Sequence, residues 1–373
     1  MRLTIEKPAL SKALGHVASV VERRNTIPIL SNVLLSASNN ELKLTATDLD
    51  MELVETVAAR AKGDGATTVP AHMLYDIVRK LPEGSEIELL RDGEQGRLTI
   101  TAGPAQFSLQ TLPADDFPAL SVDDLGHSFQ LSAGDLKRLI EKTRFAISTE
   151  ETRYYLNGIY LHATESGGKP TLRAVATDGH RLAQFELPLP SGAKGMPGVI
   201  VPRKTVLELA KLVEDADSEV RIELSPSKIR VSTARVVLTS KLIDGTFPDY
   251  ERVIPQSNDK RMEVDNTAFA QAVDRVSTLS SDKGRAVKLT ITDGKLTLSV
   301  NNPDSGSATE ELPVEYGFDP LEIGFNARYL LDCLATAEDQ VDLELQGALA
   351  PAVIRRPATG DYVYLFMPVR YPQ

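Results

Sequence analysis

The chain has 373 residues, of which 42% are hydrophobic and 25% are charged, and this composition is typical of a folded protein with two or three domains. Its single cysteine, Cys333, excludes an internal disulfide and favours a reducing compartment. Residues 1–6 alternate like a strand and lack the apolar core of a signal peptide, and no apolar run is long enough to cross a bilayer. We therefore expect a cytoplasmic protein without a membrane partner.

The net charge of −11 argues at first against a nucleic-acid partner. The total hides the distribution, however, because residues 136–144 carry four basic side chains and one acid. The acids gather in expected loops, at Asp115-Asp116, Asp123-Asp124 and residues 214–219. A basic face on an acidic chain can still bind phosphate, because the local potential decides.

Three sequence landmarks occur twice in the same order and indicate duplicated domains. The Thr-Asp pairs and the Phe-Pro pairs each recur 130 positions apart, with a Val-Pro step between them. The landmarks are Thr47-Asp48, Val69-Pro70 and Phe117-Pro118 in the first copy and Thr177-Asp178, Val201-Pro202 and Phe247-Pro248 in the second.

In the first copy, apolar residues at three- and four-residue spacing predict a helix whose buried side includes Leu10, Leu14 and Val17. Lys12 and His16 lie off that side and are expected to face solvent. The expected helices of this copy span 8–21 and 71–81, and the expected strands span 1–6, 33–38, 41–46, 53–59, 67–70, 86–91, 96–102 and 106–110.

The second copy is expected to begin near Ser128, with Ser132 as the N-cap of a helix marked by Leu136, Leu139, Ile140 and Thr143. A second helix is expected at 204–213. Its expected strands are 128–131, 155–164, 171–176, 184–188, 199–201, 220–224, 228–233 and 236–242.

A third, more diverged copy follows, in which residues 301–304 (Asn-Asn-Pro-Asp) replace the Thr-Asp turn. Phe269, Val273, Val276 and Leu279 mark the buried side of its first helix. Its expected helices are 267–279 and 327–335, and its expected strands are 261–264, 287–292, 295–301, 308–314, 322–325 and 362–367. The predicted fold class is α+β, in three tandem domains at 1–127, 128–256 and 257–373, each with two helices on β-sheets.

Seven short motifs stand in a fixed order along the second and third copies. They are Arg-Tyr-Tyr-Leu-Asn-Gly at 153–158, Ala-Thr-Asp-Gly-His-Arg-Leu-Ala at 176–183, Val-Ile-Val-Pro-Arg-Lys at 199–204, Thr-Ser-Lys-Leu-Ile-Asp-Gly at 239–245, Phe-Pro-Asp-Tyr at 247–250, Ile-Gly-Phe-Asn at 323–326 and Met-Pro-Val-Arg at 367–370. With these motifs the whole chain resembles the β subunit of bacterial DNA polymerase III, a DNA sliding clamp.

The resemblance implies a head-to-tail homodimer of three-domain chains that closes a six-domain ring around duplex DNA without reading its sequence. Such a protein is a processivity factor with no catalysis, cofactor or metal of its own. The implied partners are the polymerase III α subunit, the clamp loader δ subunit, and other polymerases and repair proteins that carry clamp-binding motifs.

The resemblance also implies three sets of site residues. A peptide-binding pocket is implied at Leu156, Thr177, Gly179, His180, Arg181, Leu182, Pro248, Arg252, Val253, Asn326, Tyr329, Leu365, Met367, Pro368, Val369 and Arg370. DNA-binding residues are implied at Arg24, Tyr154 and Tyr155, and basic residues of the helices join them at Lys12, Arg79, Lys137, Arg138, Lys142, Arg203 and Lys204. The dimer joint is implied at Phe107, Leu109 and Leu279. The chain departs from the family just before Arg153, where Thr149, Glu150 and Glu151 replace a His or Gln.

Other interpretations stay open at this stage. Any one basic residue on a helix could simply be solvated, and Met367-Pro368 could end a plain C-terminal strand. An enzyme could use Asp178 and His180 with His162 or Asp48, but no catalytic or metal-binding motif accompanies them, and both aspartates suit a turn. Cys333 stands among leucines and is expected to be a buried helix residue. A repeat scaffold that binds proteins and not DNA is the remaining alternative.

Overall fold

The computed structural model describes residues 1–92, 96–121, 125–213, 216, 218–280, 285–355 and 360–371. The acidic pair Asp123-Asp124, three of the four acids in the run at 214–219 and the last two residues of the tail lie outside the described residues. The chain divides into two compact units. The first comprises residues 1–136, 191–196 and 207–242, and the second comprises 137–190, 197–206 and 243–373.

Six α-helices are described, two from each copy: α1 (Lys7–Val20), α2 (Ala71–Lys80), α3 (Ala133–Glu141), α4 (Arg203–Leu212), α5 (Asn266–Ser277) and α6 (Ala327–Leu334). All six were predicted, with ends that differ by at most a few residues. The α1 helix buries Leu10, Leu14 and Val17 completely against α2 and the strands β3 (Glu41–Thr47) and β4 (Met51–Ala58), as its spacing predicts. The Ser132 hydroxyl accepts the Asp135 N–H at 3.0 Å, which confirms the predicted N-cap of α3.

The first unit contains two antiparallel sheets. The smaller has the order β5-β1-β7-β8-β9, and its strands are β1 (Arg2–Glu6), β5 (Arg60–Gly63), β7 (Glu86–Asp92), β8 (Arg97–Ala102) and β9 (Ala105–Gln110). The larger has the order β10-β15-β16-β17-β4-β3-β2-β6. Its strands are β2 (Asn32–Ser38), β3 (Glu41–Thr47), β4 (Met51–Ala58), β6 (Gly65–Pro70), β10 (His127–Ser132), β15 (Glu219–Leu224), β16 (Lys228–Ser232) and β17 (Val236–Lys241).

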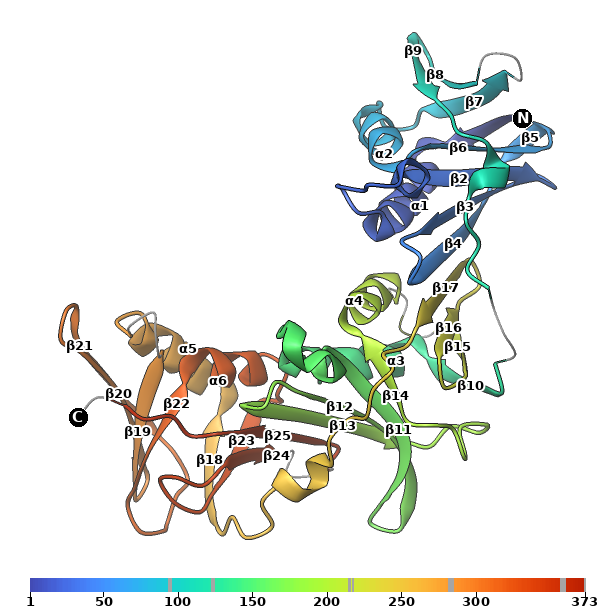
Figure 1. Ribbon diagram of the computed structural model, residues 1–373. Helices are drawn as coiled ribbons and strands as arrows, with labels where there is room; N and C mark the ends of the chain where they lie inside the picture. The colour runs from blue at the N-terminus through green and yellow to red at the C-terminus, as the bar shows by residue number, and fades with distance from the viewer. Residues whose placement is uncertain are drawn as a thin grey trace. The chain divides into compact units, whose positions relative to one another are not determined.

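The second unit also has two antiparallel sheets (Figure 1). One has the order β14-β11-β12-β13-β25-β24-β23-β18, with β11 (Gly158–Ser166), β12 (Lys169–Thr177), β13 (Arg181–Pro188), β14 (Val199–Pro202), β18 (Lys260–Asp265), β23 (Gln340–Leu345), β24 (Ala352–Arg355) and β25 (Tyr362–Phe366). The other has the order β21-β20-β19-β22, with β19 (Ala286–Thr292), β20 (Lys295–Asn302), β21 (Gly306–Pro313) and β22 (Leu321–Asn326).

Each eight-stranded sheet is shared between two copies of the repeat. In the first unit, β17 of the second copy pairs with β4 of the first, so that Leu238 lies opposite Leu53. In the second unit, β13 pairs with β25 of the third copy, so that Leu182 lies opposite Leu365. Because the copies are joined by continuous hydrogen-bonded sheet, neighbouring domains are held by backbone bonds as well as by side chains.

The structure corrects several expectations. Residues 151–156 form a 3₁₀ helix, so the strand expected from residue 155 begins at Gly158. The α5 helix ends at Ser277, and Leu279 is half-buried beyond it. His16 does not face solvent freely, because its Nδ1 lies 2.8 Å from the buried carboxylate of Glu55. Strands β5, β23 and β24 were not predicted. Within the described residues, no helix is long and apolar enough to cross a membrane.

Candidate functional site

The Thr47 and Thr177 turns have the same hydrogen bonds, which confirms that they are copies of one structure. In the second copy the Thr177 hydroxyl donates to the Arg181 carbonyl at 2.7 Å and accepts the Gly179 N–H at 3.1 Å. The Asp178 carboxylate accepts the N–H groups of His180 and Arg181 at 2.9 and 3.0 Å. The first copy repeats all four bonds from Thr47 and Asp48, at 2.7 to 3.0 Å.

Both turns need a left-handed backbone at their third residue. Leu49 has φ of 76° there, and Gly179 has φ of 87°. Glycine adopts this conformation without the penalty that a side chain carries. A Cβ at Gly179 would also lie 2.5 Å from Nη1 of Arg153. Glycine is therefore favoured at position 179 by its backbone, although Leu49 adopts the same conformation in the first copy, and a side chain at 179 would shift the Arg153 guanidinium.

Both carboxylate oxygens of Asp178 are bonded within the turn. One carboxylate oxygen accepts two backbone N–H groups, and the other lies 3.1 Å from Nε of Arg181. The predicted role of both aspartates as turn caps is confirmed. Among the described residues, no group of three His, Cys, Asp or Glu side chains could hold a metal ion.

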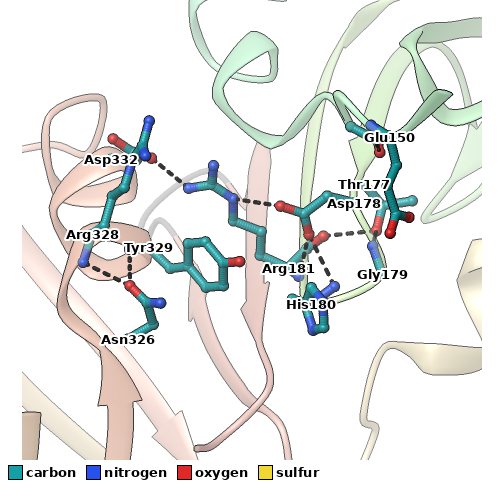
Figure 2. A network of polar contacts seen from close by, with 11 residues as sticks. Glu150, Thr177, Asp178, Gly179, His180, Arg181, Asn326, Arg328, Tyr329 and Asp332 are labelled. Carbon is teal, nitrogen blue, oxygen red and sulfur yellow. Dashed lines mark hydrogen bonds and ion pairs between the residues drawn. The ribbon is translucent and has the colours of Figure 1, made fainter. Parts of the chain in front are cut away.

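Arg181 is the centre of a buried polar network (Figure 2). Its guanidinium binds Asp178 and, at 2.6 Å, the carboxylate of Asp332 on α6. It also stacks over the rings of Tyr329 and Phe145, at 4.4 and 5.5 Å from their centroids. Because only 9% of this side chain is exposed, Arg181 holds the turn against α6 and cannot reach out to a carboxylate of a partner.

The end of the chain lies against the same turn. The Met367 N–H donates to the His180 carbonyl at 2.9 Å, and the Val369 N–H donates to the Gly324 carbonyl at 2.8 Å. Strand β25 ends at Phe366, so Met367 and the residues after it are not part of a strand. The tail therefore forms one side of a surface whose other side is the His180 turn.

A buried apolar cluster packs beneath the exposed residues of this surface, on the side of the protein interior. It contains Leu156, Leu182 and Leu365 together with Phe247 and Tyr250. Phe247 stacks on Tyr160 with ring centroids 4.9 Å apart. The short helix Tyr250–Val253, which carries Arg252 and Val253, is anchored by this cluster.

A buried arginine fixes the same short helix by polar contacts. Arg173 on β12 donates to the Tyr250 hydroxyl at 2.9 Å and to Glu251 at 2.7 Å, and it also bonds Glu186 at 3.0 Å. His162 Nε2 lies 3.0 Å from the same hydroxyl. Burial raises the pKa of Tyr250 to about 12. Burial, with the nearby Arg173, lowers the pKa of His162, so the ring is neutral and can accept from Tyr250.

The sixteen predicted pocket residues all fall in the second unit and divide by exposure. Those open to solvent are Gly179, His180, Pro248, Arg252, Val253, Met367 and Arg370. Half-buried are Asn326, Tyr329, Pro368 and Val369, and the Asn326 side chain caps α6. Leu156, Thr177, Arg181, Leu182 and Leu365 are buried and support the others. Val253 is 55% exposed and Met367 is 42% exposed, so this surface offers two apolar side chains to solvent.

The predicted DNA-binding residues differ in their exposure and in their ion pairs. Lys12, Arg24, Tyr154 and Arg203 are exposed, whereas Tyr155 and Lys204 are half-buried. Arg79 lies 2.9 Å from Asp76, Lys137 3.9 Å from Glu141, and Arg138 3.4 Å from Asp361. Lys142 is mostly buried, bonds the Thr336 carbonyl and lies over the Tyr362 ring. These ion pairs reduce the positive potential that the helices alone would suggest.

The residues predicted at a dimer joint lie on or near edges. Phe107 is 37% exposed on β9, an edge strand of the first unit, while Leu109 on the same strand is buried. Phe107 lines a cavity of about 470 Å³ with Met73 and Ile77 of α2. In the second unit, β21 is an edge strand, and Leu279 is half-buried just after α5.

Comparison with known proteins matches this fold to DNA sliding clamps along the whole chain. The family of the DNA polymerase III beta subunit matches in three consecutive parts: its N-terminal domain at residues 1–121, its central domain at 130–249 and its C-terminal domain at 251–370. The chain belongs to this family. The predicted boundaries near 127 and 256 stay predictions.

Individual relatives agree with the family. The beta sliding clamp of Caulobacter vibrioides is 53% identical over 371 residues, covering 99% of this chain and 100% of the relative. A crystal structure of the Bartonella birtlesii sliding clamp bound to griselimycin has a TM-score of 0.95 and 55% identity, with 99% of each chain covered. A Caulobacter crescentus beta sliding clamp, with PEG bound to a putative beta-motif tethering region, has a TM-score of 0.96 and 53% identity, again with 99% of each chain covered.

Proposed function

We propose that the chain is a DNA sliding clamp and the processivity factor of a replicative polymerase, without catalysis of its own. The observation that carries the proposal is the match to all three domains of one clamp family along a single chain. The chain would act in the cytoplasm on duplex DNA of any sequence, since a sliding contact needs phosphate attraction without base readout.

The proposed assembly is a head-to-tail homodimer that closes a ring. Two free sheet edges support this assembly. Strand β9 lies at one edge of the five-stranded sheet of the first unit, and β21 lies at one edge of the four-stranded sheet of the second. The outer backbone groups of both have no strand partner in the described chain. Two different edges that pair between copies make a heterologous contact, and such a contact gives a ring when its rotation closes.

The proposed partner site is the surface formed by the His180 turn, the Pro248–Val253 segment and the Met367–Arg370 tail. Exposed Val253 and Met367 offer apolar contacts, and Met adapts to varied partners. The polymerase III α subunit, the clamp loader δ subunit, other polymerases and repair proteins would each insert a short apolar peptide here. Because all would use one site on each chain, they would compete.

A topological experiment tests the clamp function. The protein is loaded on a nicked circular duplex by its clamp loader, and retention is measured by gel filtration before and after the circle is cut. A ring stays on the circle and slides off the free ends of the cut duplex. Equal retention on both would exclude the ring, and no loading at all would favour a scaffold that does not bind DNA.

The DNA contacts are tested by salt dependence. Lys12 and Arg24 are exposed, so their joint replacement by Gln should weaken DNA binding and reduce the salt slope by about 0.9 for each phosphate that the variant no longer binds. Lys142→Gln is a control, because that lysine is already bound to Thr336 and Glu338. An unchanged slope in the double variant would refute these DNA contacts.

A further inference from the structure

A cavity of about 500 Å³ lies beside the His180 turn and is lined by five arginines. Arg153 and Arg181 belong to the turn region already described. The other three are Arg144, in the 3₁₀ helix Arg144–Ala146, Arg203, the first residue of α4, and Arg328, in the first turn of α6. All of these residues belong to the second unit.

The carboxylates around the cavity are already paired. Glu150 bonds Arg153, while Asp178 and Asp332 both bond Arg181, as Figure 2 shows for the last pair of contacts. Within the described chain, the guanidinium groups of Arg144, Arg203 and Arg328 have no ion pair or hydrogen bond. Five arginines therefore face three carboxylates, and the excess positive charge falls on these three side chains.

Two of these three arginines lie at positions that disfavour a positive charge. Arg203 and Arg328 lie in the first turns of α4 and α6, and the positive end of a helix dipole disfavours a basic side chain there. The same position stabilises an anion. Three guanidinium groups and two helix starts around one cavity thus form a surface that an added anion would neutralise.

The size and position of the cavity favour a peptide carboxylate over DNA. A duplex cannot enter a cavity of about 500 Å³, whereas a single side chain of a peptide can. His180 and Tyr329, whose rings stack with centroids 6.4 Å apart, line the cavity and also belong to the proposed peptide site. A peptide held at that site therefore lies next to the arginines.

We propose that this cavity binds an aspartate or glutamate side chain that flanks the apolar motif of a partner peptide. Arg144, Arg203 and Arg328 would hold its carboxylate, as guanidinium groups commonly do in pairs of parallel hydrogen bonds. The proposal rests on the proposed peptide site. It adds a basis for partner specificity, since partners with an acidic residue beside the apolar motif bind better than partners without one.

The experiment uses two matched pairs of labelled peptides. An apolar hexapeptide is first chosen from a Leu- and Phe-rich library by its binding to the full chain. It is then extended by Asp-Asp or Asn-Asn at one end and, in the second pair, at the other end, with both termini blocked. Fluorescence anisotropy at low salt should show one Asp-Asp peptide binding about tenfold tighter than its Asn-Asn partner, a gain that salt reduces.

The double variant Arg144→Gln/Arg328→Gln should bring the two peptides of that pair to within about twofold of each other. The Kd of the Asn-Asn peptide should not change, which also shows that the site is still folded. The control Lys169→Gln/Lys194→Gln removes the same charge from two exposed lysines, one at the start of β12 and one in a loop, so the tenfold preference should persist.

Equal affinity for Asp-Asp and Asn-Asn peptides at both ends would overturn the inference and leave the peptide site standing. So would a preference that survives in the double variant. If the double variant weakens duplex binding and no peptide, the arginines bind DNA phosphate instead. If no hexapeptide binds the wild-type chain, the peptide site itself fails and this inference with it.

Discussion

The backbone N–H of Met367 donates a hydrogen bond to the carbonyl oxygen of His180 at 2.9 Å. This bond joins the tail of the third copy to the Thr177 turn of the second copy. It makes the tail a wall of the candidate site rather than a free end. Removal of either the turn or the tail should therefore disrupt the candidate peptide site.

Deletion of residues 367–373 should abolish binding of the polymerase peptide and leave the dimer intact. The deletion removes the bonds from Met367 to His180 and from Val369 to Gly324, together with the apolar surface of Met367. The proposed joint uses β9 and β21, which the deletion does not include. Peptide anisotropy and molar mass by light scattering measure the two effects. Unchanged peptide affinity would refute the site.

Gly179→Ala should destabilise the chain and weaken peptide binding. The left-handed backbone alone costs roughly 1–2 kcal/mol for an L-residue. The new Cβ also displaces Arg153, from which it would be 2.5 Å away. Gly167→Ala is the control, since it has φ of 56° and open space around its Cβ position. Denaturant unfolding should show the larger loss for Gly179→Ala, and only that variant should lose peptide affinity.

The Thr177 turn could be predicted from sequence because its contacts are local, whereas the other residues of the site were assigned by resemblance to the family. The Thr-Asp motif predicts its own turn, since its hydrogen bonds span no more than four residues. The buried state of Arg181 could not be predicted, because its partner Asp332 is 151 positions away. Only the fold therefore shows that Arg181 is a buried anchor.

The errors in the strand predictions have different causes, while most of the expected strands are present. Strand β23 carries a detectable signal, since Val341, Leu343 and Leu345 alternate and are fully buried. Strand β5 carries none, because Arg60–Gly63 is polar and pairs only at the edge of its sheet. The start of β11 was misplaced because Tyr155 and Leu156 suit a strand locally, while the Asn157 N–H bonds the Tyr154 carbonyl in a 3₁₀ turn.

Arg181→Met should lower the free energy of unfolding by about 3 kcal/mol, because it leaves Asp178 and Asp332 without their shared cation in a largely buried site. Arg252→Met is the matched control. Arg252 pairs with Asp249 at 2.5 Å but is 83% exposed, so its loss should change stability by no more than about 0.5 kcal/mol. Urea unfolding of both variants measures the difference, and equal losses would contradict a buried anchor.

His162 should make the second unit less stable in mild acid. Burial lowers the pKa of His162 in the folded chain below the ordinary value of 6.5. As pH falls below 6.5, the unfolded chain therefore takes up a proton that the folded chain resists, and stability is lost. His162→Gln, which cannot titrate, should lose less stability than wild type between neutral pH and pH about 5. If the difference in unfolding free energy between wild type and His162→Gln stays constant across that pH range, the folded chain does not hold a neutral, buried His162 ring.

Phe107→Asp should convert the dimer into monomers and abolish retention on circular DNA. Phe107 is exposed on the edge strand β9 beside the apolar side chains of α2, and a carboxylate there would have to be buried in the joint. Leu349→Asp is the control, because Leu349 is 84% exposed and belongs to no edge strand. Light scattering should give half the molar mass for the first variant and an unchanged mass for the second. A dimer that tolerates Phe107→Asp would place the joint on another surface.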